Sequence, residues 1–160
     1  MVVEFLTFSA DQTEQVGANL AALLLPGDVV AMIGDLGTGK TTLARGLANG
    51  LKVKVPASSP TFSLINHLYG SVPVIHMDAY RLSSSNDLFE LGFYDLPFEA
   101  SVLLVEWADR ILDALPEDRI TVEMSTIPDA ADARRICIRT GQCEAANRIN
   151  QLKGAHNFER

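Results

Sequence analysis

Apolar and polar positions along the chain predict short strands that alternate with helices. The apolar run at residues 29–33 lies between a Pro26-Gly27 turn and a glycine-rich loop, which predicts a strand buried on both faces. Residues 101–106 form a second run of this kind. Three more stretches have strand composition, and they lie at residues 2–8, 62–68 and 72–78, the last two joined by a turn at residues 69–71.

Helical periodicity separates several of these strands. Apolar residues recur at helical spacing after Ser9, whose side chain opens a capping box, so we expect a helix that ends before residue 26. A second helix is predicted at residues 41–50, with Gly50 as its C-terminal cap. A short third helix is predicted at residues 87–91.

The last third of the chain has a different pattern. Residues 119–125 and 134–140 both alternate between apolar and polar positions, which favours an antiparallel hairpin at the edge of the sheet. Residues 142–152 are typical of a frayed terminal helix, and residues 153–160 are expected to be disordered.

The loop after the strand at residues 29–33 carries the clearest chemistry. Residues 34–41 have the sequence GDLGTGKT and match the phosphate-binding pattern G-x-x-x-x-G-K-[ST] at every fixed position. Glycines let the backbone come close to a ligand, and successive N–H groups form an anion-binding concavity at the start of a helix. In this pattern Lys40 reaches the β- and γ-phosphates and the Thr41 hydroxyl binds Mg²⁺. We therefore predict a nucleotide site.

Two of the predicted strands end on a carboxylate, Asp78 and Glu106. P-loop enzymes use acids in such places to orient water or to act on Mg²⁺. His76 shares a strand face with Asp78, and we interpret it as a packing histidine. Thr61 lies in a loop of prolines and small hydroxyl residues, which is either a γ-phosphate sensor or a plain connection. By pattern alone, Thr13 is a helix-surface residue.

Length and composition indicate one ordinary globular domain. The chain has 160 residues, of which 48% are hydrophobic and 21% charged, so it is long enough to bury a core. The α/β order and the phosphate loop predict a P-loop NTPase-like three-layer sandwich with a mixed, mostly parallel central sheet and antiparallel edge strands. We expect an ATPase domain at residues 1–141, followed by a C-terminal helix and tail at residues 142–160.

The net charge of −7 argues against a free-standing nucleic-acid binder, whose surface should be basic. Cys137 and Cys143 have neither metal-pair nor disulfide-framework spacing, which indicates free thiols in a reducing compartment. No run approaches the length of a membrane span, so we expect no contact with a membrane and a cytoplasmic location.

Four motifs together resemble one known family. GDLGTGKTT at residues 34–42, SPTF at 59–62, HMDAYRL at 76–82 and VEW at 105–107 resemble the TsaE family, formerly called YjeE, in order and spacing. The resemblance covers roughly residues 9–140. It implies a small bacterial P-loop ATPase that is needed for N6-threonylcarbamoyladenosine, the modified base at position 37 of tRNAs that read ANN codons.

The resemblance also implies a set of site residues. ATP or ADP phosphates are assigned to Gly37, Thr38, Gly39, Lys40, Thr41 and Thr42, and Mg²⁺ to Thr41 and Glu106. The catalytic group near the γ-phosphate comprises Lys40, Asp78 and Thr61. Three further residues are implied beside the nucleotide, namely Thr13, Trp107 and Arg134. The family usually has Ala or Ser where this chain has Thr38.

In this family the ATPase acts through the TsaB–TsaD pair, which holds the tRNA, so contact with tRNA is expected to be indirect. We expect the loop at residues 56–61 and the segment at residues 80–92, which have few packed apolar residues, to be ordered by such a partner.

Three other functions share the phosphate loop. A small-molecule or nucleoside kinase needs an acceptor pocket and usually a basic lid, and the chain has no obvious basic lid. A guanine-nucleotide switch would carry an N-K-x-D motif, which the sequence lacks. A nucleotide-gated interaction module, in which hydrolysis is incidental, is the third alternative.

Overall fold

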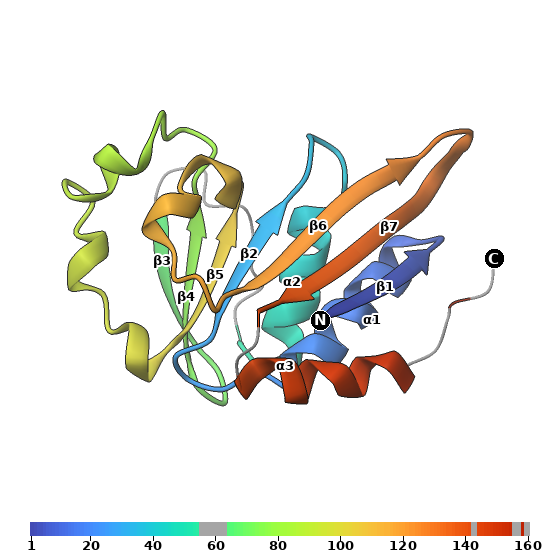
Figure 1. The fold of residues 1–160 in the computed structure, drawn as a ribbon, viewed down its shortest axis with the longest axis horizontal. Coiled ribbons are helices and arrows are strands. Elements are labelled where there is room, and N and C mark those ends of the chain that lie inside the picture. The colour runs from blue at the N-terminus through green and yellow to red at the C-terminus, as the bar shows by residue number, and fades with distance from the viewer. Residues whose placement is uncertain (55–63, 142–143, 155–157, 159–160) are drawn as a thin grey trace.

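The computed structural model describes residues 1–54, 64–141, 144–154 and 158. The described residues form one seven-stranded sheet with the order β1-β7-β6-β2-β5-β4-β3 (Figure 1). The strands are β1 (Val2–Thr7), β2 (Val29–Ile33), β3 (Ile65–Tyr69), β4 (Pro73–Asp78), β5 (Val102–Glu106), β6 (Ile120–Ile127) and β7 (Ala130–Thr140).

The central strands β6, β2, β5 and β4 are mutually parallel, and β7 and β3 run against their neighbours. The edge strands β1 and β3 are both paired antiparallel. The predicted mixed, mostly parallel sheet with antiparallel edges is therefore confirmed.

The predicted position of the β6–β7 hairpin was wrong. The two strands pair antiparallel as expected, but β6 also pairs in parallel with β2, and β7 pairs with the N-terminal strand β1 (Figure 1). Strands β6 and β7 alternate because only one of their faces is covered. Residues of β1, β6 and β7 belong to the core cluster on that face, and none of them belongs to the cluster on the other face. Alternation indicates a half-covered strand and does not show that the strand lies at an edge.

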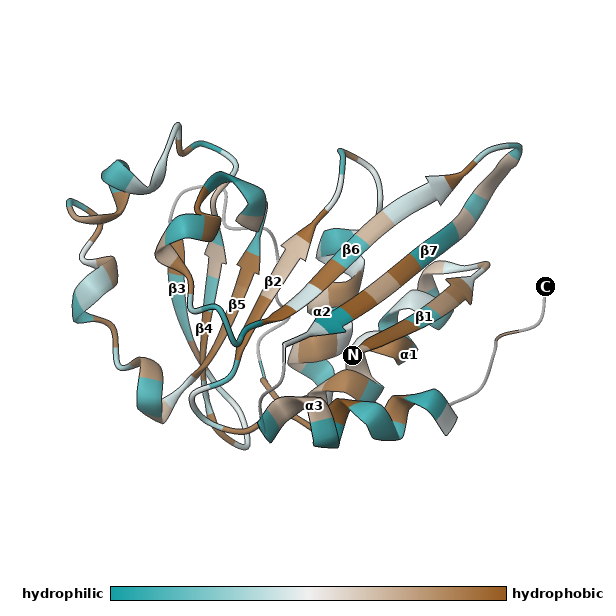
Figure 2. Ribbon diagram, viewed as in Figure 1, coloured by the Kyte–Doolittle hydropathy of each residue, from teal (hydrophilic) through white to brown (hydrophobic). Residues whose placement is uncertain are grey.

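Helices cover one face of the sheet. Helices α1 (Ala10–Ala21), α2 (Lys40–Gly50) and α3 (Glu144–Ile149) pack there, and each contributes apolar residues to the core cluster on this face; Figure 2 colours apolar positions brown. The Ser9 cap is confirmed, because the Ser9 hydroxyl accepts from the Gln12 N–H at 3.2 Å. The Gln12 side chain accepts in return from the Phe8 N–H at 2.6 Å, one residue before the cap residue of the predicted capping box.

Gly50 does not cap helix α2 as predicted. It is the last residue of the helix, and the cap position is Leu51. A Cβ atom at position 50 would lie 2.6 Å from the Ala21 Cβ, so glycine is required there by the close approach of α1 to α2.

The opposite face of β2, β5 and β4 is covered by irregular chain. Short 3₁₀ helices replace the predicted helix at residues 87–91, and they include Ser85–Leu88, Phe93–Asp95 and Phe98–Ala100. Leu82, Leu88 and Phe93 are buried in the second core cluster. Of the apolar side chains at residues 80–92, only Leu82 and Leu88 are buried, which agrees with the expectation of few packed apolar residues there. These two side chains hold the segment on the sheet. The two covered faces and the sheet between them make the three predicted layers.

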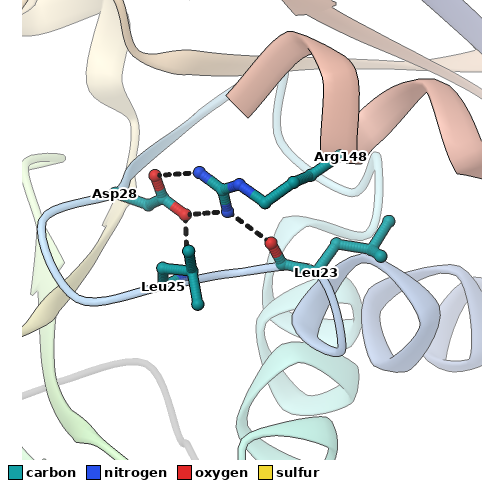
Figure 3. A network of polar contacts seen from close by, with 4 residues as sticks. All are labelled: Leu23, Leu25, Asp28 and Arg148. Atoms are coloured by element: carbon teal, nitrogen blue, oxygen red, sulfur yellow. Dashed lines mark hydrogen bonds and ion pairs between the residues drawn. The ribbon is translucent and has the colours of Figure 1, made fainter. Parts of the chain in front are cut away.

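The C-terminal helix packs on the domain. Ala145, Ile149 and Leu152 are buried in the core cluster on the α1 and α2 face. The guanidinium of Arg148 contacts both carboxylate oxygens of Asp28, at 2.8 and 2.9 Å, and also donates to the Leu23 carbonyl (Figure 3).

Of the residues predicted to be disordered, Lys153 and Gly154 end a 3₁₀ helix, Asn150–Gly154, and Phe158 packs against the core. The remaining residues of that tail, and Cys143, lie outside the described part of the chain; Cys137 is free and buried. Within the described residues, no helix is long and apolar enough to cross a membrane.

Candidate functional site

The glycine-rich loop joins strand β2 to helix α2 with the geometry that its sequence predicts. Gly37 has φ 79° and Gly39 has φ 98°, a left-handed region that favours glycine. The Thr38 hydroxyl donates to the Asp35 carbonyl at 2.9 Å, so the side chain that differs from the family's usual residue stabilises the turn. Helix α2 begins at Lys40, so its free N–H groups face the loop.

A cavity of about 440 Å³ opens beside this loop. This volume lies in the range of small-molecule and cofactor sites. Its lining comes from the loop and helix α2, from the ends of β4 and β5, and from β7. The residues are Leu36, Gly37, Gly39, Lys40, Thr41, Thr42, Asp78, Tyr80, Glu106, Trp107 and Arg134.

Lys40 is buried and is held by its own loop. Its Nζ donates to the carbonyls of Gly34 at 2.6 Å and Asp35 at 2.8 Å, and it lies 3.9 Å from the centre of the Trp107 ring. Burial lowers the pKa of Lys40, while the nearby Glu106 carboxylate acts in the opposite direction. The cavity wall thus contains a desolvated amine beside the loop.

Glu106 joins three elements of the site. It is 1% exposed; its Oε1 accepts from the Thr41 hydroxyl at 2.9 Å, and its Oε2 lies 2.7 Å from the His76 Nε2. Strands β4 and β5 are parallel and pair Asp78 with Glu106, which brings both strand-end acids to the same edge of the sheet.

Asp78 is less enclosed than Glu106, and its carboxylate accepts from the Tyr80 N–H at 2.9 Å. Burial raises the pKa of Asp78 and outweighs this hydrogen bond. A carboxylate with a raised pKa in a cavity is a better proton acceptor than an ordinary aspartate.

The sequence interpretation of His76 as a packing histidine missed its contact with Glu106. It is buried, as expected of a packing histidine, but its partner is the carboxylate that the sequence assigned to a metal. Since the Glu106 carboxylate can only accept, the His76 Nε2 donates in this pair. The available signal was the face that His76 shares with Asp78, but the pairing of β4 with β5 was needed to interpret it.

Trp107 directly follows Glu106 and has φ 57° and ψ 39°, a left-handed conformation rare for a bulky residue. Its ring centre lies 4.9 Å from that of Tyr80, on the cavity wall. The ring therefore contacts Lys40 and Tyr80, two cavity residues from different elements.

Arg134 extends from β7 to the phosphate loop, where its Nη2 donates to the Gly37 carbonyl at 3.1 Å. It also lines a second hollow of about 110 Å³ together with Thr13, Gly39 and Thr42. Thr13 is 2% exposed, and its hydroxyl lies 2.8 Å from the Thr7 hydroxyl, so the helix-surface interpretation was wrong. Thr61 lies outside the described residues.

The Glu106 carboxylate at the end of β5 and the Thr41 hydroxyl at the start of α2 fit a magnesium ion that is shared with phosphates. The described residues contain no group of three or more His, Cys, Asp or Glu side chains that could hold a metal alone. Mg²⁺ bound with a nucleotide takes only one or two protein ligands, at about 2.0–2.1 Å. The Thr41 hydroxyl donates to the Glu106 Oε1 at 2.9 Å, which brings one hydroxyl and one carboxylate oxygen together beside the phosphate loop.

Comparisons with known proteins agree on one family. A family model described as "Threonylcarbamoyl adenosine biosynthesis protein TsaE" matches residues 7–136. A TsaE of Streptomyces coelicolor is 41% identical over 132 residues, 79% of this chain and 88% of that protein. A TsaE of Treponema pallidum is 36% identical over 121 residues, 76% of this chain and 90% of that protein.

A solved structure is similar over almost the whole chain. The crystal structure of YdiB from Bacillus subtilis superposes with a TM-score of 0.77 at 29% sequence identity. The match covers 95% of this chain and 94% of that one, so it includes the C-terminal helix that the family model leaves out.

Proposed function

This chain belongs to the TsaE family of tRNA threonylcarbamoyladenosine biosynthesis, and we propose that within this pathway it is a Mg²⁺-dependent ATPase. The chain itself is then needed for N6-threonylcarbamoyladenosine at position 37 of tRNAs that read ANN codons. The observation that carries this proposal is the single cavity in which the phosphate loop meets Asp78 and Glu106.

We assign the phosphates of ATP or ADP to residues 37–42, with Lys40 as the buried cation. Mg²⁺ is assigned to Thr41 and Glu106, whose hydroxyl and carboxylate oxygens are hydrogen-bonded to each other beside the phosphate loop. Bound Mg-ATP supplies the phosphoanhydride bond and the metal charge that offsets negative charge as this bond breaks. The chain contributes positions, dipoles and a buried amine.

Asp78 is proposed to orient the attacking water, because it lies beside Glu106 and its pKa is raised by burial. Thr61 is proposed to assist near the γ-phosphate on the family pattern alone. Thr13, Trp107 and Arg134 are assigned to the surroundings of the nucleotide, since the three line the two adjoining hollows.

The partner is proposed to be the TsaB–TsaD pair, with tRNA contacted only through it, and the location to be the cytoplasm. Hydrolysis by the chain alone should be weak and should rise with the partner, because a docked partner would hold the groups near the γ-phosphate in their productive geometry. A net charge of −7 favours a partner with a basic face and predicts that association weakens with salt.

The proposal is tested by ADP release from the purified chain alone, with the TsaB–TsaD pair, and with a panel of nucleosides and small acceptors. We expect stimulation by the pair and no phosphate transfer to any acceptor. Robust transfer to an acceptor without stimulation by the pair would replace the ATPase with a kinase.

Trp107 should report the nucleotide state, because its ring contacts Lys40 and lines the cavity. It is the chain's only tryptophan, so intrinsic fluorescence is specific to it. We expect a change in intensity or emission wavelength when Mg-ATP is added, and no response in a Lys40→Met variant. An unchanged spectrum in the wild-type chain would remove Trp107 from the nucleotide site.

His76→Leu should raise the Mg²⁺ concentration that gives half-maximal hydrolysis by about tenfold or more, because it removes the donor that orients Glu106. His76→Gln retains an N–H donor and should keep most of the wild-type affinity. Mn²⁺ binding in the presence of ADP, followed by paramagnetic resonance, measures the same effect without turnover. His67→Leu, at an exposed position of β3, is the matched control. Equal metal affinity in all four proteins would return His76 to a packing role.

A further inference from the structure

The segment from Tyr80 to Ala100 is fixed on the sheet by its own contacts. Leu88 and Phe93 are 0% and 2% exposed and pack in the second core cluster. The Ser83 hydroxyl donates to Asp87 at 2.9 Å, and the Ser85 hydroxyl donates to Asp113 at 2.6 Å. The segment therefore has a defined shape in the chain by itself, although it contains only short 3₁₀ turns.

Between these buried residues the segment exposes large apolar side chains. Phe89 is 80% exposed, Tyr94 58% and Leu91 37%. Each of the first two directly follows a buried neighbour, Leu88 or Phe93, so burial of one side chain directs the next outward. Rigid, exposed aromatic side chains are typical of binding hot spots, because little conformational entropy is lost when they are covered. Phe89, Leu91 and Tyr94, three exposed side chains within six consecutive residues, are called the Phe89 surface below.

Acidic residues are interleaved with this surface. Glu90, Asp95 and Glu99 are all exposed. The occupant should therefore present an apolar recess that is flanked by Lys or Arg side chains. In a two-fold contact between two copies of the chain, these acids would face the same acids of the other copy and repel them. A nucleic acid or an anionic membrane would be repelled for the same reason.

We propose that the Phe89 surface is where the chain binds a protein partner with a basic rim, and that this partner is the TsaB–TsaD pair. The identity of the partner rests on the proposed function, whereas the location and chemistry of the surface rest on the exposure of Phe89 and its neighbours. Aromatic residues are enriched in specific protein interfaces, and the polar groups around them set which partner fits.

The same segment begins in the nucleotide cavity. Tyr80 lines the cavity and packs on Trp107, and the Arg110 guanidinium lies 5.3 Å from the Tyr80 ring. Arg110 also donates to the Leu82 carbonyl at 3.3 Å. The cavity wall and the Phe89 surface thus belong to one continuous, hydrogen-bonded segment. Nucleotide state and partner binding are coupled through it, and the coupling acts in both directions.

The test is the affinity of the purified TsaB–TsaD pair for the full chain, measured by calorimetry with Mg-ADP present. Phe89→Ser should weaken binding by about thirtyfold or more, as expected for a hot-spot residue. Glu90→Lys should also weaken it, because it places a cation against the basic rim. Tyr69→Ser is the matched control, since Tyr69 is 74% exposed at the end of β3. The affinity of the pair for this variant should stay within about twofold of that for the wild-type chain.

Each variant should keep the wild-type melting temperature and nucleotide affinity, because Phe89 and Glu90 are exposed and do not line the cavity. If the pair binds the wild-type chain and Phe89→Ser equally well, the surface is wrong and the proposed function stands. If the pair does not bind the wild-type chain, the proposed partner fails, and the surface loses its assigned occupant. Self-association of the wild-type chain that Phe89→Ser abolishes would assign the surface to a second copy instead.

Discussion

Lys40→Ala is expected to lower the affinity for an ATP analogue at least about a hundredfold. The amine is buried beside the phosphate loop and donates to two loop carbonyls, so it is positioned for phosphates before any ligand binds. A hydrogen bond to a charged group contributes about 1.5–3 kcal/mol, and the loss of two such bonds to phosphate gives this factor or more.

Two further variants separate the charge of Lys40 from its packing. Lys40→Met retains an aliphatic stem beside Trp107 and should lose as much affinity as the alanine variant. Arg45→Ala removes an exposed cation from the same helix, where it pairs with Glu14, and should bind normally. Calorimetric titration with a non-hydrolysable ATP analogue measures all four proteins. Wild-type affinity in both Lys40 variants would overturn the assignment of the phosphate loop.

Glu106→Ala is expected to reduce Mg²⁺-dependent hydrolysis about a hundredfold or more and to change the fold much less. Loss of groups that merely orient metal ligands costs 10–100-fold, so the ligand itself should cost at least as much. Alanine also leaves the buried His76 without its partner, which costs about 1–3 kcal/mol of stability.

Glu106→Gln avoids most of that stability cost, because its amide fills the same space and its oxygen still accepts from the Thr41 hydroxyl. Its N–H₂ group donates to the His76 Nε2 once that ring takes the other neutral tautomer. It should match the alanine variant in hydrolysis and the wild-type chain in melting temperature. The measurement is the rate of hydrolysis against Mg²⁺ concentration, with ADP affinity in the absence of metal as the control. An unchanged Mg²⁺ dependence in both variants would reduce Glu106 to a residue that ends a strand.

The local parts of the site were accessible from the sequence because they depend on neighbouring residues. Five apolar residues followed by a glycine-rich loop specify a strand, an anion cradle and a helix within a short stretch. The meeting of Asp78 with Glu106 was also predictable in outline, since parallel strands end at the same edge of a sheet.

Other features depend on pairing between distant segments, and local pattern does not encode this. The contact of His76 with Glu106 requires that β4 lies beside β5 in one register. Arg134 contacts Gly37 across 97 positions, because β7 lies inside the sheet and extends to the phosphate loop. The alternating pattern of β6 and β7 led to the prediction that their hairpin forms the edge of the sheet. That pattern carries no information on β1, which pairs with β7 and forms the edge instead.

The central claim is that hydrolysis of Mg-ATP in this cavity is what the chain contributes to threonylcarbamoyladenosine formation. The most direct measurement is threonylcarbamoyl-tRNA formed over several turnovers by the TsaB–TsaD pair, with the wild-type chain or with Glu106→Gln. We predict sustained turnover with the wild-type chain. We predict that turnover is lost with a Glu106→Gln protein that still binds ATP. Full turnover with a variant that binds ATP but no longer hydrolyses it would contradict the claim and identify the chain as a nucleotide-gated interaction module.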